Sequence, residues 1–125
     1  MKKKKILVID DSDILCNTLK ARLEANGPYT VRAEIKGNLT LSAAKNFLPD
    51  LIMLDILMPD IDGVSVAMAL KKDPSIKGIP IIFLTAIAQN EDVQEQGNTF
   101  GGYHVLPKSI KTSDLIKCIT ENLNK

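Results

Sequence analysis

The chain has 125 residues, of which 45% are apolar and 25% are charged, a composition typical of a globular domain with a substantial core. Its formal net charge of +1 gives no bulk attraction to nucleic acid or to membranes, so neither is expected as a partner. No apolar stretch approaches the ~20 residues that cross a bilayer, and the apolar run after the basic start is too short for a signal peptide. We therefore expect one cytoplasmic domain over residues 1–125.

A few residues are predicted to be structural. The run from Lys2 to Lys5 predicts a solvated, partly frayed N-terminus, with a contact to an acidic partner as the alternative. Cys16 and Cys118 have no CxxC motif and no partner histidine, so we expect reduced thiols and neither a disulfide nor a metal site. His104 is the only histidine, and a single imidazole beside no motif predicts a structural or surface role.

Short apolar runs alternate with helical patterns five times along the chain. The predicted strands cover residues 6–9, 29–35, 51–54, 79–84 and 103–106. The predicted helices, one after each strand, end near residues 26, 48, 72, 100 and 123. Asp13 is the candidate N-cap of the first helix and Asn38 or Thr40 that of the second, while Thr112 or Ser113 begins the last.

Five strand–helix units of this size predict an α/β fold, a five-stranded parallel sheet with helices on both faces and right-handed crossovers. The run at residues 51–54 is fully apolar, as a central strand should be. The helix around residues 90–100 carries only Val93 and Phe100 as large apolar residues, and Gly97 costs it about 1 kcal/mol relative to alanine. This helix is predicted to be weakly anchored.

Polar side chains follow four of the five predicted strands at the point where each strand ends. The residues concerned are Asp10 and Asp11, Asp55, Thr85 and Lys108. The carboxyl ends of parallel strands meet at one rim of a sheet, where functional groups gather. We therefore expect three carboxylates, a hydroxyl and an ammonium in one cleft.

This set of groups suits phosphoryl transfer. Three carboxylates at one rim repel one another unless a cation joins them. Mg²⁺ is a hard cation that uses one or two carboxylates, waters and a phosphate oxygen. A carboxylate can also attack phosphorus to form an aspartyl phosphate. The metal, the lysine and the hydroxyl would then stabilise the charge on the transferring group.

The chain resembles the receiver domains of response regulators in two-component signalling, including the chemotaxis regulator, over essentially its whole length. The segments that carry the resemblance are Ile6–Ser12 (ILVIDDS), Asp50–Gly63 (DLIMLDILMPDIDG), Leu84–Ala86 (LTA) and Leu106–Lys108 (LPK). The second segment is the most specific of the four. The resemblance implies a flavodoxin-like (βα)5 fold with the strand order 2-1-3-4-5.

The same resemblance implies roles for the acidic residues. Asp55 corresponds to the phosphoacceptor, which also contacts the metal, and Mg²⁺ or Mn²⁺ is the implied cofactor. Asp11 corresponds to a direct metal ligand and Asp10 to a residue that acts mainly through metal-bound water. The backbone carbonyl of Leu57 is implied as a further ligand.

It also implies roles for the remaining rim residues and for partners. Thr85 would hydrogen-bond one phosphoryl oxygen, and Lys108 would pair with another. A histidine kinase or a histidine phosphotransfer protein is the implied donor. Phosphorylation would rearrange residues 85–110 for an output partner, or for a second copy of the chain, at the face formed by residues 90–125. The implied chemistry is limited to the domain's own phosphorylation and slow dephosphorylation, so no general enzyme activity is expected.

Three positions depart from the family pattern. Val105 stands where the family has an aromatic switch residue, and Tyr103 is the candidate substitute on the same strand face. Ser109 replaces the usual proline after the lysine, which predicts a trans peptide bond and a looser loop. Leu57 and Ile87 are apolar where the family tunes hydrolysis, which predicts a long-lived aspartyl phosphate.

Two alternatives stay open at this point. A degenerate receiver that binds partners constitutively would fit Val105 and Ser109. A phosphatase of the haloacid-dehalogenase type would fit the Asp11–Asp13 segment after a strand, but it would not explain the segment around Asp55. The sequence has no DNA-binding helix pair, kinase core or effector enzyme, so it fits both a stand-alone protein and one domain of a longer protein.

Overall fold

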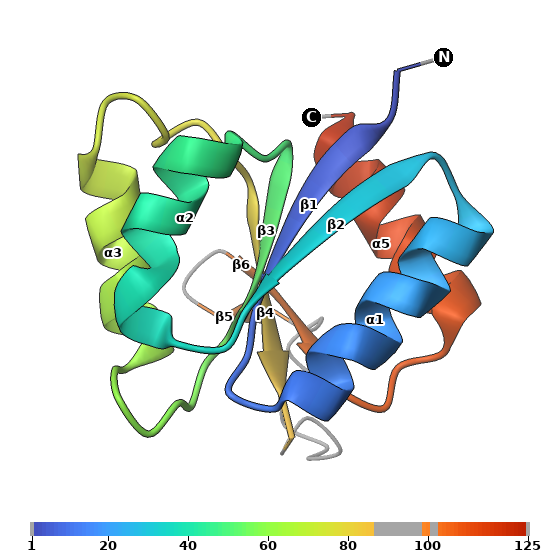
Figure 1. The fold of residues 1–125 in the computed structure, drawn as a ribbon, viewed down its shortest axis with the longest axis horizontal. Helices are drawn as coiled ribbons and strands as arrows, with labels where there is room; N and C mark the ends of the chain where they lie inside the picture. The colour runs from blue at the N-terminus through green and yellow to red at the C-terminus, as the bar shows by residue number, and fades with distance from the viewer. Residues whose placement is uncertain (1, 87–98, 101–102, 125) are drawn as a thin grey trace.

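A computed structural model describes residues 2–86, 99–100 and 103–124, in which a six-stranded sheet lies between two layers of helices (Figure 1). The strands are β1 (Lys4–Ile9), β2 (Tyr29–Glu34), β3 (Leu51–Asp55), β4 (Ile81–Thr85), β5 (Thr99–Phe100) and β6 (Tyr103–Pro107). The helices are α1 (Asp13–Asn26), α2 (Thr40–Phe47), α3 (Gly63–Lys72) and α5 (Thr112–Leu123), with a 3₁₀ turn, η1, at Gly37–Leu39. None of the helices described is long and apolar enough to cross a membrane.

The five parallel strands have the predicted topology. Their spatial order is β2-β1-β3-β4-β6, which is the order 2-1-3-4-5 when the parallel strands are numbered along the chain. The register aligns the strand ends at one rim, since Ile9 pairs with Leu54 and Thr85 pairs with Pro107. The residues that follow these strands are thereby brought together at that rim.

The short strand β5 is an addition to the predicted sheet. It pairs antiparallel with β6 at the edge, with Phe100 opposite Tyr103. Phe100 was predicted to end a helix, and this part of the prediction is wrong because residues 99–100 form edge-strand pairs instead. The rest of the predicted helix, including Val93 and Gly97, lies outside the described residues, as does Ile87.

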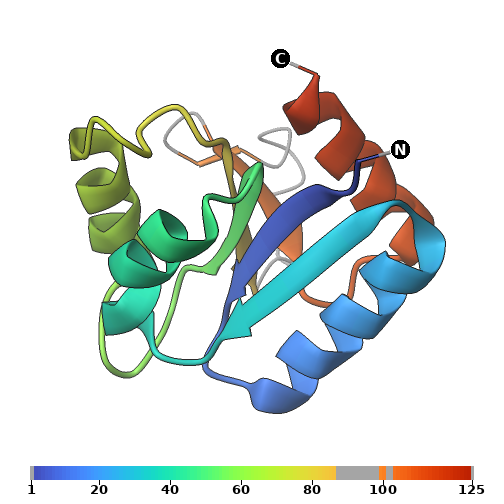
Figure 2. The same ribbon diagram turned by 45° about the horizontal axis from the view of Figure 1, so that its top comes forward.

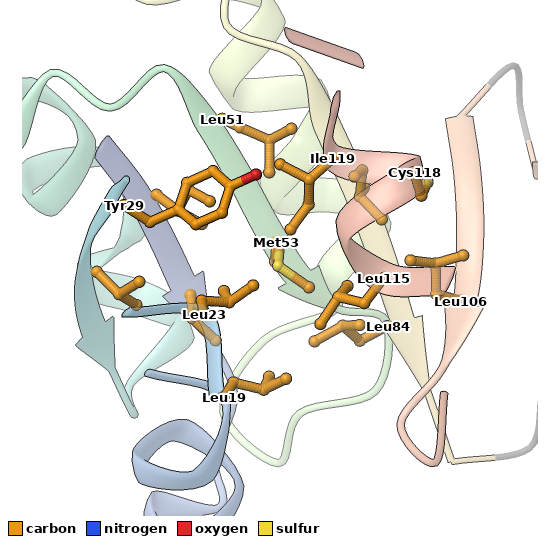
Figure 3. Close-up of a cluster of buried hydrophobic side chains, with 14 of the residues drawn as sticks. Leu19, Leu23, Tyr29, Leu51, Met53, Leu84, Leu106, Leu115, Cys118 and Ile119 are labelled. Atoms are coloured by element: carbon orange, nitrogen blue, oxygen red, sulfur yellow. The ribbon is translucent and has the colours of Figure 1, made fainter. Parts of the chain in front are cut away.

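Each face of the sheet carries its own apolar core. Figures 1 and 2 show α1 and α5 covering one face and α2 and α3 covering the other. All five residues of β3 are buried, and their side chains alternate between the two faces. Met53 packs on the α1 and α5 side, and Ile52 packs on the α2 and α3 side. Burial of one such side chain contributes about 1.5–3 kcal/mol. Figure 3 shows the first core, where both helices meet the sheet through side chains that include Leu19, Leu23, Leu115 and Ile119.

The starts of α1 and α2 differ from their predictions. Ser12, not Asp13, caps α1, because its Oγ accepts a hydrogen bond from the N–H of Leu15 at 3.2 Å. Asp13 is the first helical residue, where its negative charge favours the positive end of the helix dipole. The last helix begins at Thr112, as predicted.

The chain enters α2 through η1, so neither predicted cap is used. Leu39 occupies the cap position without a side-chain hydrogen bond. Thr40 is the first residue of α2, and its hydroxyl donates backwards to the carbonyl of Gly37 at 2.7 Å. Asn38 lies inside η1, and its N–H donates to Asp60 Oδ2 at 3.0 Å. The tight turn supplies the hydrogen bonds that a capping side chain would otherwise make.

Two strand boundaries also shift. β4 begins at Ile81 instead of residue 79, because Pro80 has no N–H to donate to a neighbouring strand. β2 ends at Glu34, one residue before the predicted end of the strand, and Ile35 beyond it is 44% exposed. The lysine run is only partly solvated, since Lys5 lies within β1 and its Nζ donates to the carbonyl of Phe47 at 2.7 Å.

Candidate functional site

One ammonium group joins two of the carboxylates at the rim of the sheet. Lys108, directly after β6, places its Nζ 2.9 Å from Asp10 Oδ2 and 3.1 Å from Asp55 Oδ2. Asp10 follows β1 and Asp55 ends the adjacent strand β3, whereas Lys108 follows β6, which is separated from β3 by β4. The contact therefore joins the ends of three strands. Asp11 completes the acidic group, because Asp10, Asp11 and Asp55 each offer a carboxylate oxygen within 4.8 Å of the others. The predicted convergence of carboxylates and ammonium is therefore present.

Thr85 lies beside this group as the last residue of β4. It is buried, with 3% of its surface exposed, and its carbonyl oxygen accepts a hydrogen bond from the N–H of Lys108 at 3.0 Å. The end of β4 thus fixes the backbone of the lysine that follows β6. All five rim residues named from the sequence therefore lie along one edge of the sheet.

Asp55 is held at both oxygens. It is 2% exposed, its Oδ1 accepts from the N–H of Leu57 at 3.2 Å, and its Oδ2 contacts the Lys108 ammonium. Burial raises the pKa of Asp55 to about 6, and the charge of Asp10 adds to this effect although the hydrogen bond from Lys108 opposes it. The ionised form of this carboxylate is therefore costly until more positive charge arrives.

Lys108 is charged at neutral pH. Burial lowers its pKa, but the close contacts with the negative charges of Asp10 and Asp55 outweigh burial and raise the pKa above its usual value. Lys108 therefore supplies one positive charge to a site that holds three carboxylates.

The two neighbouring acidic residues have different environments. Asp10 is fully buried, and its Oδ1 accepts from the N–H of Ser12 at 2.9 Å. Its Oδ2 contacts Lys108 but makes no well-oriented hydrogen bond with any residue in the described part of the chain. Asp11 is exposed at the open side of the group. Three carboxylates, one of them with an incompletely satisfied buried oxygen, fit a hard divalent cation such as Mg²⁺.

The loop from β3 to α3 is built tightly around Asp55. Asp62 caps α3, since its Oδ1 accepts from the N–H of Val64 at 3.0 Å. Gly63 does not have a φ in the left-handed region, so conformational freedom is not what this position requires. Its role is spatial, because a Cβ there would collide with the backbone carbonyl of Asp55. Whether the carbonyl of Leu57 binds a metal stays a prediction.

The positions that depart from the family pattern have clear surroundings. Val105 is 2% exposed and packs in the core beneath α2 and α3. The Tyr103 ring makes an edge-to-face contact with Phe83 at 5.3 Å between centroids, and Lys71 Nζ lies 5.9 Å from the Tyr103 centroid. Tyr103 is thus held at the start of β6, and its use as a substitute switch stays a prediction. No peptide bond in the described residues is cis, so the trans bond expected before Ser109 is present.

The cysteines have partners that the sequence did not predict. Both are free thiols, as expected. Cys118 was predicted to have no partner histidine, but His104 Nδ1 lies 3.2 Å from its Sγ. Asn122 fixes this pair by donating to the carbonyl of Cys118 at 2.8 Å, with its Nδ2 also 3.1 Å from His104 Nδ1. His104 therefore has the structural role predicted for it.

Cys16 lies beneath the acidic group. Its Sγ donates to the carbonyl of Asp10 at 3.4 Å. Burial and the negative charge of Asp10 raise the pKa of the Cys16 thiol to about 11. The thiol is therefore neutral and contributes packing under the site.

Sequence reasoning missed one polar residue near the site, Arg22 of α1. Its guanidinium donates to the backbone carbonyl of Ile110 and to the hydroxyl of Thr112, both at 2.8 Å. The available signal was its place in α1 between the buried Leu19 and Leu23, where a charged side chain needs a partner.

The family model described as "Response regulator receiver domain" matches residues 6–120 of the chain. Among curated proteins, the chain is 38% identical over 106 residues to the response regulator PleD of Caulobacter vibrioides, covering 85% of this chain and 23% of PleD. It is 30% identical over 120 residues to the polar-differentiation response regulator DivK of Brucella anthropi, covering 96% of each. The chain thus spans about a quarter of PleD and nearly all of DivK.

Solved structures share the fold over nearly the whole chain. The chemotaxis protein CheY4 of Vibrio cholerae has a TM-score of 0.80 at 25% identity, covering 96% of this chain and 98% of CheY4. The receiver domain of the Francisella response regulator 1452 has a TM-score of 0.78 at 26% identity, covering 98% of each. Together with the family match, these similarities show that the chain belongs to the response regulator receiver domains of two-component signalling.

Proposed function

We propose that this domain is a signalling switch in which Asp55 accepts a phosphoryl group with the help of a divalent metal ion. The observation that carries the proposal is the shared ammonium of Lys108, 2.9 Å from Asp10 and 3.1 Å from Asp55. Three carboxylates with one positive charge need a further cation, and a phosphoryl group would bring more negative oxygens to the same place. A receiver domain is not a classical enzyme, so the reaction modifies the domain itself.

The proposed step forms a bond between a carboxylate oxygen of Asp55 and phosphorus, while the bond from phosphorus to the donor breaks. The donor atom keeps the electron pair of that bond and takes up a proton. Mg²⁺ or Mn²⁺, held by Asp10, Asp11, Asp55 and the Leu57 carbonyl, would supply the positive charge that favours ionised Asp55. The N–H of Leu57 already orients Asp55 Oδ1 at 3.2 Å.

Lys108 and Thr85 complete the proposed site. In the structure the Lys108 ammonium lies between Asp10 and Asp55, so it is close enough to move to an incoming phosphoryl oxygen. Thr85 would hydrogen-bond a second phosphoryl oxygen from the end of β4. Movement of Thr85 toward that oxygen would change residues 85–110, of which 87–98 and 101–102 lie outside the described residues.

The donor we propose is the phosphohistidine of a histidine kinase or a histidine phosphotransfer protein, since the chain belongs to the receiver family. An output partner, or a second copy of the chain, would bind the face formed by residues 90–125. Residues 1–125 would act as one receiver domain, either in a stand-alone protein or within a longer one, since the receiver family model matches residues 6–120.

A degenerate receiver that binds partners constitutively is the second candidate. The observation that favours it is Val105, which is 2% exposed in the core at the position of the usual aromatic switch. The acidic group favours the phosphorylated switch instead, because a constitutive binding module has no use for three converging carboxylates. The dehalogenase-type alternative does not account for membership of the receiver family.

Intact-mass measurement with a small acyl phosphate and Mg²⁺ tests the proposal. The wild type is expected to gain about 80 Da, the mass of one phosphoryl group. Asp55→Asn should gain nothing, while Asp114→Asn, which changes an exposed aspartate of α5, should behave as the wild type. An unmodified wild type that still binds a partner would favour the degenerate receiver.

A further inference from the structure

The backbone that carries Lys108 forms a turn with few fixed points of its own. The N–H of Ile110 donates to the carbonyl of Pro107 at 3.1 Å and closes the turn around Lys108 and Ser109. On the sheet side, the N–H of Lys108 is tied to Thr85 at 3.0 Å. Ser109 is exposed and lacks the ring that fixes φ in a proline. The far side of the turn therefore needs another restraint.

Arg22 supplies that restraint from α1. Its Nη2 donates to the carbonyl of Ile110, and its Nε donates to Thr112 Oγ1, both at 2.8 Å. Hydrogen bonds from a charged guanidinium are among the stronger ones, and its planar fork fixes direction as well as distance. No carboxylate in the described part of the chain forms an ion pair with Arg22. Both contacts of its guanidinium are thus with the segment that follows Lys108.

The same helix also anchors the acidic side of the site. Ser12, the cap residue of α1, directly follows Asp10 and Asp11, and its N–H donates to Asp10 Oδ1 at 2.9 Å. Figure 1 shows α1 and α5 lying together on one face of the sheet. The body of α1 is fixed to that face by buried side chains such as Leu19. One rigid helix therefore contacts both the carboxylate and the lysine sides of the cleft.

We propose that Arg22 is a positioning residue that holds the Lys108 turn so that the ammonium meets the transferring phosphoryl group. The inference deepens the proposed function and rests on it. Arg22 does not touch the reacting atoms, and it acts through Ile110 and Thr112. A misplacement of about 1 Å at a reacting group can cost about 100-fold in rate, so a loosened turn should slow the transfer itself.

The test compares rates of phosphorylation by an acyl phosphate at saturating Mg²⁺ and saturating donor. Arg22→Ala and Arg22→Lys should both be slower, by about 10-fold. Alanine makes neither hydrogen bond, and the single ammonium of lysine cannot reproduce the planar two-donor geometry of the guanidinium. Arg32→Ala is the matched control, since Arg32 is the only other arginine and is exposed on β2, and it should react as the wild type. Thr112→Val should slow the reaction, whereas Thr112→Ser keeps the acceptor oxygen and should restore it. The Mg²⁺ dissociation constant should change less than about 2-fold in all five variants.

A double-mutant cycle separates positioning from general damage. In a Lys108→Ala background, Arg22→Ala should have almost no further effect on rate, because the group that Arg22 positions is gone. An equal loss with and without Lys108, or an unchanged rate in Arg22→Ala, would overturn the inference. Hydrogen exchange of the Lys108 amide gives a readout that needs no phosphorylation, and Arg22→Ala should exchange about 10-fold faster than Arg32→Ala. A wild type that is not phosphorylated at all would defeat the proposed function, while unchanged exchange would defeat the role of Arg22.

Discussion

Asp10 and Asp55 share one counter-ion, the Lys108 ammonium, which lies 2.9 Å from the first carboxylate and 3.1 Å from the second. Both carboxylates are buried, with 0% and 2% of their surfaces exposed. A buried carboxylate pair with half of the charge it needs is costly to keep ionised. This relationship links the stability of the domain to the metal and phosphoryl groups that it is proposed to bind.

The stability of the metal-free domain should fall as the pH rises through the titration of Asp55. Its pKa is about 6 in the folded protein and 3.8 in the unfolded reference, so the folded state holds the proton more tightly between these values. The stabilising contribution of protonated Asp55 is then fully present below about pH 4 and is lost progressively as the pH rises to about 6. Asp55→Asn removes the cost of ionising this buried carboxylate. The difference in unfolding free energy between Asp55→Asn and the wild type should therefore shift in favour of the variant by about 2 kcal/mol from pH 4 to pH 7.

Urea unfolding at intervals from pH 4 to pH 8 without metal measures this difference. Asp114→Asn provides the control, because an exposed carboxylate on α5 should show no such growth. Added Mg²⁺ should restore stability to the wild type at pH 7 and much less to Asp55→Asn. A gap between Asp55→Asn and the wild type that stays constant with pH would show that Asp55 carries no ionisation cost.

Gly63→Ala should displace the backbone at Asp55 and Ile56. The new Cβ would collide with the carbonyl of Asp55 and lie 2.8 Å from the Cα of Ile56, both of them backbone atoms that cannot rotate away. Overpacking of this kind costs about 1–3 kcal/mol, and it should also reduce Mg²⁺ affinity by moving Asp55. Gly78→Ala is the matched control, since nothing lies within 4 Å of a Cβ there. Thermal unfolding with and without Mg²⁺ compares the two variants, and equal effects would rule out the spatial role given to Gly63.

Cys16 should be inert in the folded protein. It is 1% exposed and its pKa is about 11, so almost no reactive thiolate forms at pH 8. In a Cys118→Ser variant, which leaves Cys16 as the only thiol, alkylation by iodoacetamide should be at least about 100-fold slower in buffer than in urea. Mass spectrometry over time follows the reaction. Rapid labelling of the folded variant would mean that the thiol under Asp10 is neither buried nor neutral.

The phosphoryl group on Asp55 should be long-lived. Leu57 is 64% exposed beside Asp55, and its side chain has no group that could orient an attacking water. Leu57→Gln adds such a group and should shorten the lifetime several-fold. Met68→Gln, which changes another exposed apolar residue, on α3, should leave the lifetime unchanged. Loss of the added mass after removal of the donor gives the lifetimes, and complete loss from the wild type within seconds would contradict this prediction.

The rim of the sheet was predictable because parallel strands must end together. Buried apolar runs located Asp10, Asp55 and Thr85 at strand ends, and the topology then forced them to one edge. The α1 cap was missed because Asp10 binds the N–H of Ser12, a contact that depends on the end of β1 and not on helix propensity. The η1 turn before α2 was missed for a similar reason, since Asn38 is fixed by the distant Asp60.

The contacts that the sequence concealed join segments far apart along the chain. Arg22 reaches the start of α5, and His104 of β6 meets Cys118 and Asn122 of α5. Local patterns carry no information on such pairs, because they depend on how helices pack across a completed sheet. The edge pairing of Phe100 was hidden as well, since its short run resembles the end of a weak helix.

Chemical trapping of the phosphorylated residue tests the central claim most directly. Borohydride reduces an aspartyl phosphate to homoserine, so peptide mapping after treatment with acyl phosphate, Mg²⁺ and borohydride identifies the acceptor by its position. We expect homoserine at position 55 alone, and none when Mg²⁺ is omitted. Homoserine at another aspartate, or none at any position in a folded protein that binds Mg²⁺, would contradict the assignment of Asp55 as the phosphoacceptor.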